Sequence, residues 1–151
     1  MPFVKLDCGI LNSTLWIDRA AREIFITALL MAEPFEVRSP LETLNVYDIK
    51  PAQFKVPPGW YGFVPAAGPG IVRMAGLDRK EGMEALERLG APESESRSPE
   101  YDGRRMVRIS GGYIILNFTK YREKDSTTAE RSKRWRERQK IKEAEAASRV
   151  S

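Results

Sequence analysis

Three arginines lie close together in a segment that is predicted to form a β-hairpin. The dipeptide Gly111-Gly112 separates two apolar runs, and the run before it carries Arg104, Arg105 and Arg108. Tyr113 follows directly after the dipeptide. A guanidinium group presents a planar fork of donors that matches phosphate oxygens, and an aromatic ring can stack on a base. These residue types indicate recognition of a nucleic-acid backbone rather than catalysis.

The last fifth of the chain carries a second and larger set of cations. Residues 119–151 hold 11 Lys and Arg against 6 Asp and Glu, a net charge of +5, whereas residues 1–118 hold 14 against 15, a net charge of −1. Such a basic tail favours phosphate contacts that weaken steeply with salt. The predicted nucleic-acid contacts are Arg79, Lys80, Arg104, Arg105, Arg108, Tyr113, Lys120, Arg122, Lys124, Arg131, Lys133, Arg134, Trp135, Arg136, Arg138 and Lys140.

The residue types that are missing narrow the possible functions. The chain has no histidine and a single cysteine, Cys8, which excludes Cys/His and Ser/His nucleophile systems and the usual zinc sites. Its glycines fit neither the dinucleotide nor the Walker spacing. We therefore predict no enzyme activity, no cofactor and no metal site. Catalysis by carboxylates alone is the weaker alternative.

Apolar runs, the N-terminal residues and the cysteine content indicate in which compartment the protein acts. No apolar run approaches the roughly 20 residues of a membrane-spanning helix, so no membrane partner is expected. The N-terminal residues lack the basic and apolar regions of a signal peptide. A lone cysteine fits a reducing compartment. These features predict a cytoplasmic protein.

The hairpin that carries the arginines is expected to have two different faces. A two-residue Gly-Gly turn would place Arg108 opposite Ile115. Because side chains alternate along a strand, the predicted core face is Val107, Ile109, Ile114, Leu116 and Phe118. The opposite face is Arg104, Met106, Arg108, Tyr113, Ile115 and Asn117, and Arg105 lies at a frayed end from which it can reach solvent. This second face is either an ordinary solvated surface or a wing, a hairpin whose arginines contact phosphates with Tyr113 at its tip.

Helices are predicted on both sides of a proline-rich segment. Asp18 can cap a helix that runs to Ala32, and a short helix over 70–77 ends near Gly76. Residues 78–81 match a capping box for a helix that ends near Leu89. A last helix is expected from Thr128 to about residue 147. Residues 33–69 hold seven of the ten prolines and are predicted to be irregular, although 53–56 and 60–64 could add short pieces to a sheet edge.

Three segments resemble a known group of proteins. They are 86–105, Gly111-Gly-Tyr-Ile-Ile-Leu-Asn-Phe-Thr-Lys-Tyr-Arg122 and Ala129-Glu-Arg-Ser-Lys-Arg-Trp-Arg-Glu-Arg138. The run from 70 to 138 resembles bacteriophage winged-helix proteins similar to replisome-organiser or replication-initiation N-terminal domains. This resemblance implies an α+β winged helix-turn-helix domain over 1–124, with 33–69 inserted, and a basic helical tail over 125–151. It also implies DNA binding in the cytoplasm of a bacterial host, as an adaptor in replication initiation or as a regulator.

The helix over 78–89 allows a second interpretation of the function. In a helix-turn-helix protein the second helix lies in the major groove, but here it exposes Glu81, Glu84 and Glu87, which would oppose the phosphates. DNA binding is therefore expected to be of low specificity. The alternative is a protein-interaction module. In that case the acidic helix face and the aromatic segment 54–63 bind a host or phage replication protein, and the tail is solvated or binds RNA.

Overall fold

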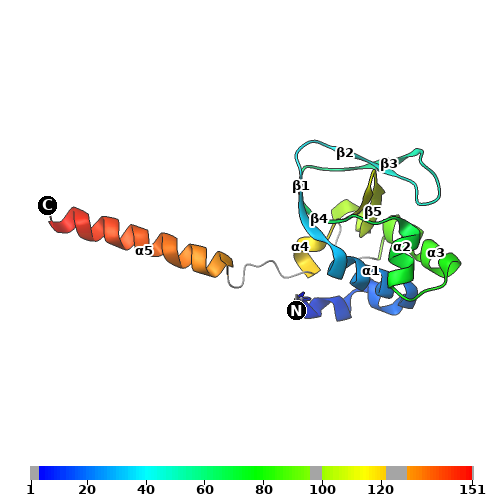
Figure 1. The fold of residues 1–151 in the computed structure, drawn as a ribbon, viewed down its shortest axis with the longest axis horizontal. Coiled ribbons are helices and arrows are strands. Elements are labelled where there is room, and N and C mark those ends of the chain that lie inside the picture. Colours follow the sequence, from blue (N-terminus) through cyan, green and yellow to red (C-terminus); the bar gives the residue numbers. More distant parts are fainter. Residues whose placement is uncertain (1–3, 96–99, 122–128, 151) are drawn as a thin grey trace.

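The protein has an α+β fold in which helices cover one face of an antiparallel sheet (Figure 1). The computed structural model describes residues 4–95, 100–121 and 129–150. The helices are α1 (Arg19–Met31), α2 (Gly68–Met74), α3 (Arg79–Gly90), α4 (Phe118–Tyr121) and α5 (Ala129–Val150), and short 3-10 turns are η1 (Cys8–Asn12), η2 (Thr14–Ile17) and η3 (Glu100–Gly103). The strands are β1 (Glu33–Val37), β2 (Leu41–Leu44), β3 (Pro51–Val56), β4 (Gly59–Val64), β5 (Met106–Ile109) and β6 (Gly112–Ile115).

The helices start where the sequence places their capping residues. The Asp18 carboxylate accepts a hydrogen bond from the backbone N–H of Ala21, and Asp78 accepts one from that of Glu81. The apolar stripes of the helices then pack on the sheet. The largest buried members of this core are Ile24, Phe25, Leu29, Ile71, Leu86, Met106, Tyr113 and Ile115.

The segment 33–69 differs most from its predicted irregular structure, because it contains β1, β2, β3 and β4. Its prolines occupy positions that a sheet tolerates. Pro34 lies in the edge strand β1, Pro51 is the first residue of the other edge strand β3, and residues 57–58 form the turn before β4. The piece expected at 53–56 does lie at a sheet edge, whereas β4 pairs with a strand on each side.

The sheet cannot be flat. Only residues 38–40 connect β1 to β2, although the strand order β1-β4-β6-β5-β2-β3 puts three strands between them. Four strand spacings in a flat sheet would amount to about 19 Å. The four residue steps from Val37 to Leu41 can span at most about 14 Å. The sheet therefore curls strongly, and the chain turns from β1 directly into β2 (Figure 1).

A second hydrophobic cluster fills the inside of this curl. Strands β1, β3, β4, β5 and β6 all contribute to it, through Val37, Val56, Tyr61, Val107, Ile109 and Ile114. Tyr101 closes the cluster, since its ring makes edge contacts with the rings of Phe54 and Tyr61. The helices thus cover one face of the sheet, and the sheet covers much of its other face by itself.

The β5–β6 hairpin occupies the middle of the sheet and is not a projecting wing. It pairs with β4 on one side and with β2 on the other. Arg108 lies opposite Tyr113 rather than Ile115, because Gly112 belongs to β6 and the turn is made by 110–111, with Gly111 at φ 91°. A Cβ atom on Gly112 would lie 2.0 Å from the carbonyl oxygen of Val64, so this glycine is held against β4. The pairing slips by two residues, which keeps the side chains of the two strands on their predicted faces. Phe118, which begins α4, was predicted on the face of Val107 and Ile114 but packs with the helices instead.

Close packing between α2 and α3 leads to a first prediction. A Cβ atom on Gly82 would lie 2.3 Å from Cγ1 of Val72, whereas one on Gly70 would meet no atom within 4 Å. We expect Gly82→Ala to lower the free energy of unfolding by about 1–3 kcal/mol through overpacking. Gly70→Ala, the matched control, should be neutral or raise it by up to about 1 kcal/mol, since alanine favours helix. Urea denaturation measures both, and equal effects would contradict the close approach of the two helices.

Candidate nucleic-acid interface

Arg105 is buried inside the protein. The prediction that it reaches solvent is therefore wrong. Its side chain is almost fully covered, and the residue is 6 % exposed. The guanidinium group forms an ion pair with the carboxylate of Glu93 and donates hydrogen bonds to Oγ1 of Thr14 at 2.7 Å and Oγ of Ser13 at 3.2 Å. Its backbone N–H donates to the carbonyl of Leu89. Arg105 therefore joins the N-terminal turns, the end of α3 and the hairpin.

Arg104 and Arg108 also direct their guanidinium groups toward the protein. Arg104 donates to the carbonyl of Gly90 at 2.6 Å and lies 5.0 Å from the centre of the Phe54 ring. The carbonyls at a helix C-terminus lack partners within the helix, so this contact caps α3. Arg108 donates to the carbonyls of Asn45 and Val46, each at 3.0 Å, and so fastens the β2–β3 connection to β5. Both side chains are half-buried, and each uses one guanidinium nitrogen to hold neighbouring backbone.

Tyr113 belongs to the core, which corrects its predicted place at an exposed tip. The residue is 2 % exposed, and burial raises the pKa of its hydroxyl. Its hydroxyl lies beside the start of α2, where a Cβ atom on Gly68 would come within 2.8 Å of it. The side chain cannot stack on a base in this position. The face that was predicted to contact nucleic acid is therefore mostly an interior face, because α1, α2 and α3 pack on it.

The electrostatics of the Glu93 carboxylate support a structural role for Arg105. Burial opposes its ionisation, but hydrogen bonds to Arg105 and Thr14 outweigh that effect and hold the pKa of Glu93 below its ordinary value. The Glu93 carboxylate is consequently ionised at neutral pH. A buried arginine without its partner, or the partner without it, would leave an uncompensated charge.

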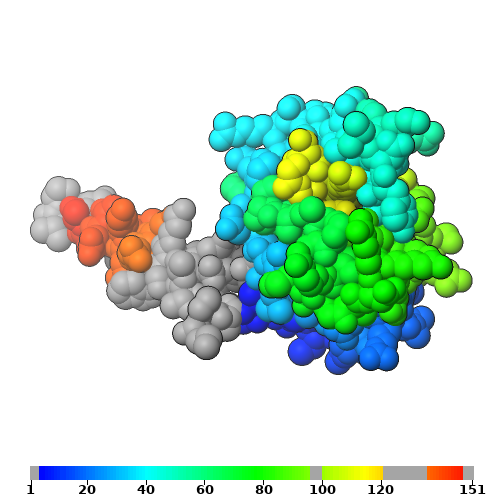
Figure 2. Space-filling view, turned by 45° about the vertical axis from the view of Figure 1, so that its right-hand side comes forward, coloured from blue at the N-terminus to red at the C-terminus, as the bar shows by residue number. Residues whose placement is uncertain are grey.

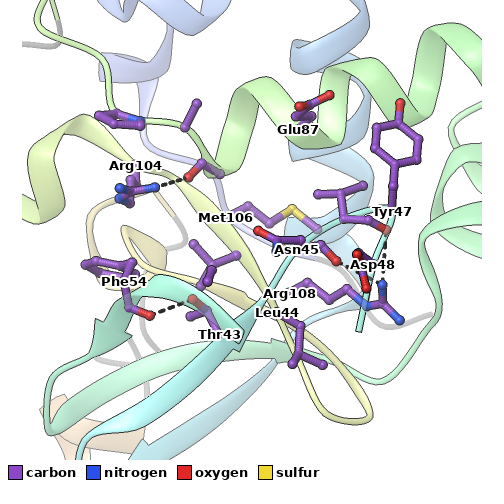
Figure 3. A pocket seen from close by; sticks show the side chains of 16 residues that line it. Thr43, Leu44, Asn45, Tyr47, Asp48, Phe54, Glu87, Arg104, Met106 and Arg108 are labelled. Atoms are coloured by element: carbon purple, nitrogen blue, oxygen red, sulfur yellow. Dashed lines mark hydrogen bonds between the residues drawn. The ribbon is translucent and has the colours of Figure 1, made fainter. Parts of the chain in front are cut away.

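A pocket of about 430 Å³ opens between the end of α3, the β2–β3 connection and β5 (Figure 3). Leu44, Phe54, Met106 and Val107 provide an apolar lining, and Glu87 projects from α3 at the rim. Arg104 and Arg108 form part of its wall through the contacts described above. Among the described residues, no three cysteine or carboxylate side chains gather in a way that could hold a metal ion.

One exposed group of cations lies at the turn between α2 and α3, which form the surface toward the viewer in Figure 2. Arg73 ends α2, and Arg79 and Lys80 begin α3; all three are exposed. Gly76, at φ 73°, allows the tight turn that brings the two helix ends together. Arg79 and Lys80 were predicted as contacts, whereas Arg73 was not. The only sequence feature that could have indicated Arg73 is its position as a single cation after the apolar pair 71–72 in a short helix.

The second exposed group lies on α5, which projects from the globular part in Figures 1 and 2. The helix itself was predicted, within a few residues at each end. Of residues 136–147 all are exposed except the half-buried Gln139, so Arg136, Arg138 and Lys140 face solvent. Lys120, on α4, is also exposed. The other predicted contacts lie outside the described residues, either entirely (Arg122 and Lys124) or in their side chains (Arg131, Lys133, Arg134 and Trp135).

Comparison with known proteins assigns no relative. No family model, curated protein or solved structure matches this chain. In the part of the chain that the structure describes, the helices are too short or too polar to cross a membrane.

Neutralising the buried arginine should destabilise the fold. We expect Arg105→Ala to lower the free energy of unfolding by about 3 kcal/mol, because it leaves Glu93 without its partner and Ser13 and Thr14 without their donor. Arg79→Ala removes an equally charged but exposed side chain and should change it by less than about 0.5 kcal/mol. Chemical denaturation of the two variants measures the difference. Equal stabilities would show that Arg105 is free to contact a ligand.

An ion pair between α1 and α3 should make stability depend on pH. Arg88 donates to Asp18 at 2.7 and 3.0 Å, and these hydrogen bonds hold the pKa of Asp18 below its ordinary value of 3.8, although burial opposes them. Because the folded pKa is lowered, the stabilisation is present above about pH 3.8 and is lost as the pH falls through the folded pKa. Asp18→Asn retains the helix cap but not the charge. The difference in unfolding free energy between wild type and Asp18→Asn should therefore disappear in acid, and a constant difference would contradict the ion pair.

Proposed function

We propose that this protein binds nucleic acid through α5 and the α2–α3 turn, with low sequence specificity. The observation that carries the proposal is the exposure of Arg136, Arg138, Lys140 and Lys142 on a helix that projects from the globular part. A cationic helix of this kind follows the phosphates of a duplex or a single strand and releases their counterions. The turn adds Arg73, Arg79 and Lys80 as a second contact.

The order of elements supports a winged-helix origin for the globular part. Without β1, β2 and β3, the chain runs α1, β4, α2, α3, β5, β6, and β4, β6 and β5 are neighbours in the sheet. This arrangement contains the helix, helix, helix and hairpin that the sequence predicts for such a domain. The three additional strands extend the sheet on both sides of the hairpin. We infer that they turn the hairpin of a free wing into the middle of a wider sheet.

The charges of α3 favour low specificity. It begins with Arg79 and Lys80, but Glu81, Glu84 and Glu87 are exposed after them. A recognition helix lies in a groove between two rows of phosphates, which would repel these carboxylates. The start of α3 can therefore approach a phosphate backbone while the rest of the helix stays outside the groove.

The resemblance to bacteriophage proteins suggests a biological context for this binding. An adaptor for replication initiation, or a regulator, must hold DNA and a protein at the same time in the cytoplasm of a bacterial host. The globular part supplies a mainly acidic helix face, and α5 supplies the cations. This division of charge suits a protein that binds DNA with one part and a replication protein with another.

A protein-interaction module is the second candidate, and the pocket beside α3 favours it. The pocket has an apolar lining and a carboxylate at its rim. The aromatic segment 54–63 contributes less than predicted, because Tyr61 is buried and Phe54 and Phe63 pack against the second cluster. Only Trp60, at 59 % exposure, offers a large exposed ring in this segment.

Neutralising four cations of α5 should weaken binding and reduce its dependence on salt. We expect the variant Arg136→Gln, Arg138→Gln, Lys140→Gln, Lys142→Gln to lower the slope of log affinity against log salt by up to about 3.6 for a random duplex. Fluorescence anisotropy with labelled duplex, single-stranded DNA and RNA measures the slope.

A matched control changes the other charge on the same helix. The variant Glu137→Gln, Glu143→Gln, Glu145→Gln should bind at least as tightly as wild type, since it removes repulsion only. The variant Arg73→Gln, Arg79→Gln, Lys80→Gln tests the turn in the same assay. Absence of salt-sensitive binding by the wild-type protein at about 50–100 mM salt, where non-specific contacts are strong, would refute the proposed function.

A further inference from the structure

The pocket between α3 and the β2–β3 connection has the form of a docking groove. Three strands contribute apolar side chains to its lining, with Met106 on β5, Leu44 on β2 and Phe54 on β3 (Figure 3). Tyr47 stands at the rim and is 61 % exposed. A volume of about 430 Å³ accommodates a large aliphatic side chain together with part of the element that carries it.

The rim of this groove on the α3 side is acidic. Glu87 lines the mouth of the groove, and Glu84 is exposed one helical turn earlier on the same side of α3. Neither glutamate forms a salt bridge with a described residue. The cations of the wall are already engaged, because Arg104 and Arg108 donate to main-chain carbonyls. Asp48 lies 3.8 Å from the ammonium group of Lys50.

Helix α5 carries the complementary pattern. Ile141 is 59 % exposed and is the one large apolar side chain between 136 and 147. Lys140 and Lys142 flank it, and Arg138 lies one turn earlier on the same side of the helix. Most of the stability of a helix in a protein comes from packing of its apolar face rather than from helix propensity. Burial of Ile141 against a partner would therefore stabilise both the contact and the helix.

The chain is long enough to bring α5 to the groove. Eight residue steps separate Tyr121 from Ala129 and can span up to about 28 Å. The twelve steps along the helix to Ile141 add about 18 Å. A domain of about 120 residues has a radius of gyration of only about 14 Å, so Ile141 can reach any side of it. Tethering gives such a contact an effective concentration in the millimolar range.

We propose that the groove between α3 and the β2–β3 connection docks α5 of the same chain, with Ile141 in the apolar lining and Lys140 and Lys142 beside Glu84 and Glu87. The projecting helix of Figure 1 is then the released arrangement. Docking occupies the cations that would contact phosphates, so nucleic acid and the groove compete for α5. This competition rests on the proposed function, whereas the docking itself does not.

Zero-length cross-linking of the full chain tests the docking directly. A carbodiimide joins a carboxylate to an amine only where they touch, so we expect links from Glu84 or Glu87 to Lys140 or Lys142 at low salt, identified by mass spectrometry. The links should fade at high salt, where the Debye length falls to about 3 Å at 1 M. In a mixture of isotopically labelled and unlabelled protein the links should join residues of the same copy. Links between copies, or the absence of these links, would overturn the proposal.

Two matched variants show whether Ile141 is the anchor. Ile141→Ser should abolish the links, because it removes the apolar anchor but not the helix, since serine and isoleucine have similar helix propensity. Ala146→Ser, at another exposed position of the same helix, should leave the links unchanged. If nucleic acid competes, Ile141→Ser should also tighten DNA binding by about fivefold, the lower range of measured coupling between two sites. Unchanged links in Ile141→Ser would overturn the anchor. A protein that shows the links but no DNA binding would retain the docking and lose the proposed function.

Discussion

The short connection between β1 and β2 determines much of this structure. Three residues cannot join strands that are separated by three others in a flat sheet, so the sheet must curl. The curl brings side chains from both edge strands together on one face, where they form the second cluster with Tyr61 and Ile114. The helices need to cover only the other face. A chain of this length thereby buries both sides of its central hairpin without a second layer of helices.

Burial of the hairpin changes the meaning of its arginines. On a projecting wing, a guanidinium group is a ligand for phosphate; in the middle of a curled sheet it becomes a tie between loops and strands. Arg105 neutralises a half-buried carboxylate, while Arg104 and Arg108 satisfy carbonyls that no strand or helix can satisfy. The cations that remain available for a ligand consequently lie at the α2–α3 turn and on α5. Cationic side chains at these two places lack such structural duties among the described contacts.

The sequence was sufficient for α1, α2, α3 and α5, although not for the short α4, and for the faces of the two hairpin strands. Capping residues such as Asp18 and Asp78 act within a few residues, and alternation along β5 and β6 is equally local. The curl was not accessible, because it depends on which distant strands pair. Proline content was misleading for 33–69, since proline is compatible with edge strands and turns as well as with irregular loops. The arginine pattern could not distinguish a wing from a buried hairpin either. Tyr113 has the same place in the sequence in both cases, and only the packing of α1 and α2 buries it.

The central position of β5 and β6 also has a consequence for how the chain folds. The strands made first form two separate ribbons, β1 with β4 and β2 with β3, and neither ribbon pairs with the other. The hairpin that joins them is the last part of the sheet to be synthesised, and its contacts, such as Gly62 with Ile115, span a long loop. Long-range pairing of this kind slows folding. The sheet can thus form only as one cooperative unit after residue 115 is available, and until then both ribbons present an open edge to any chaperone or neighbouring chain.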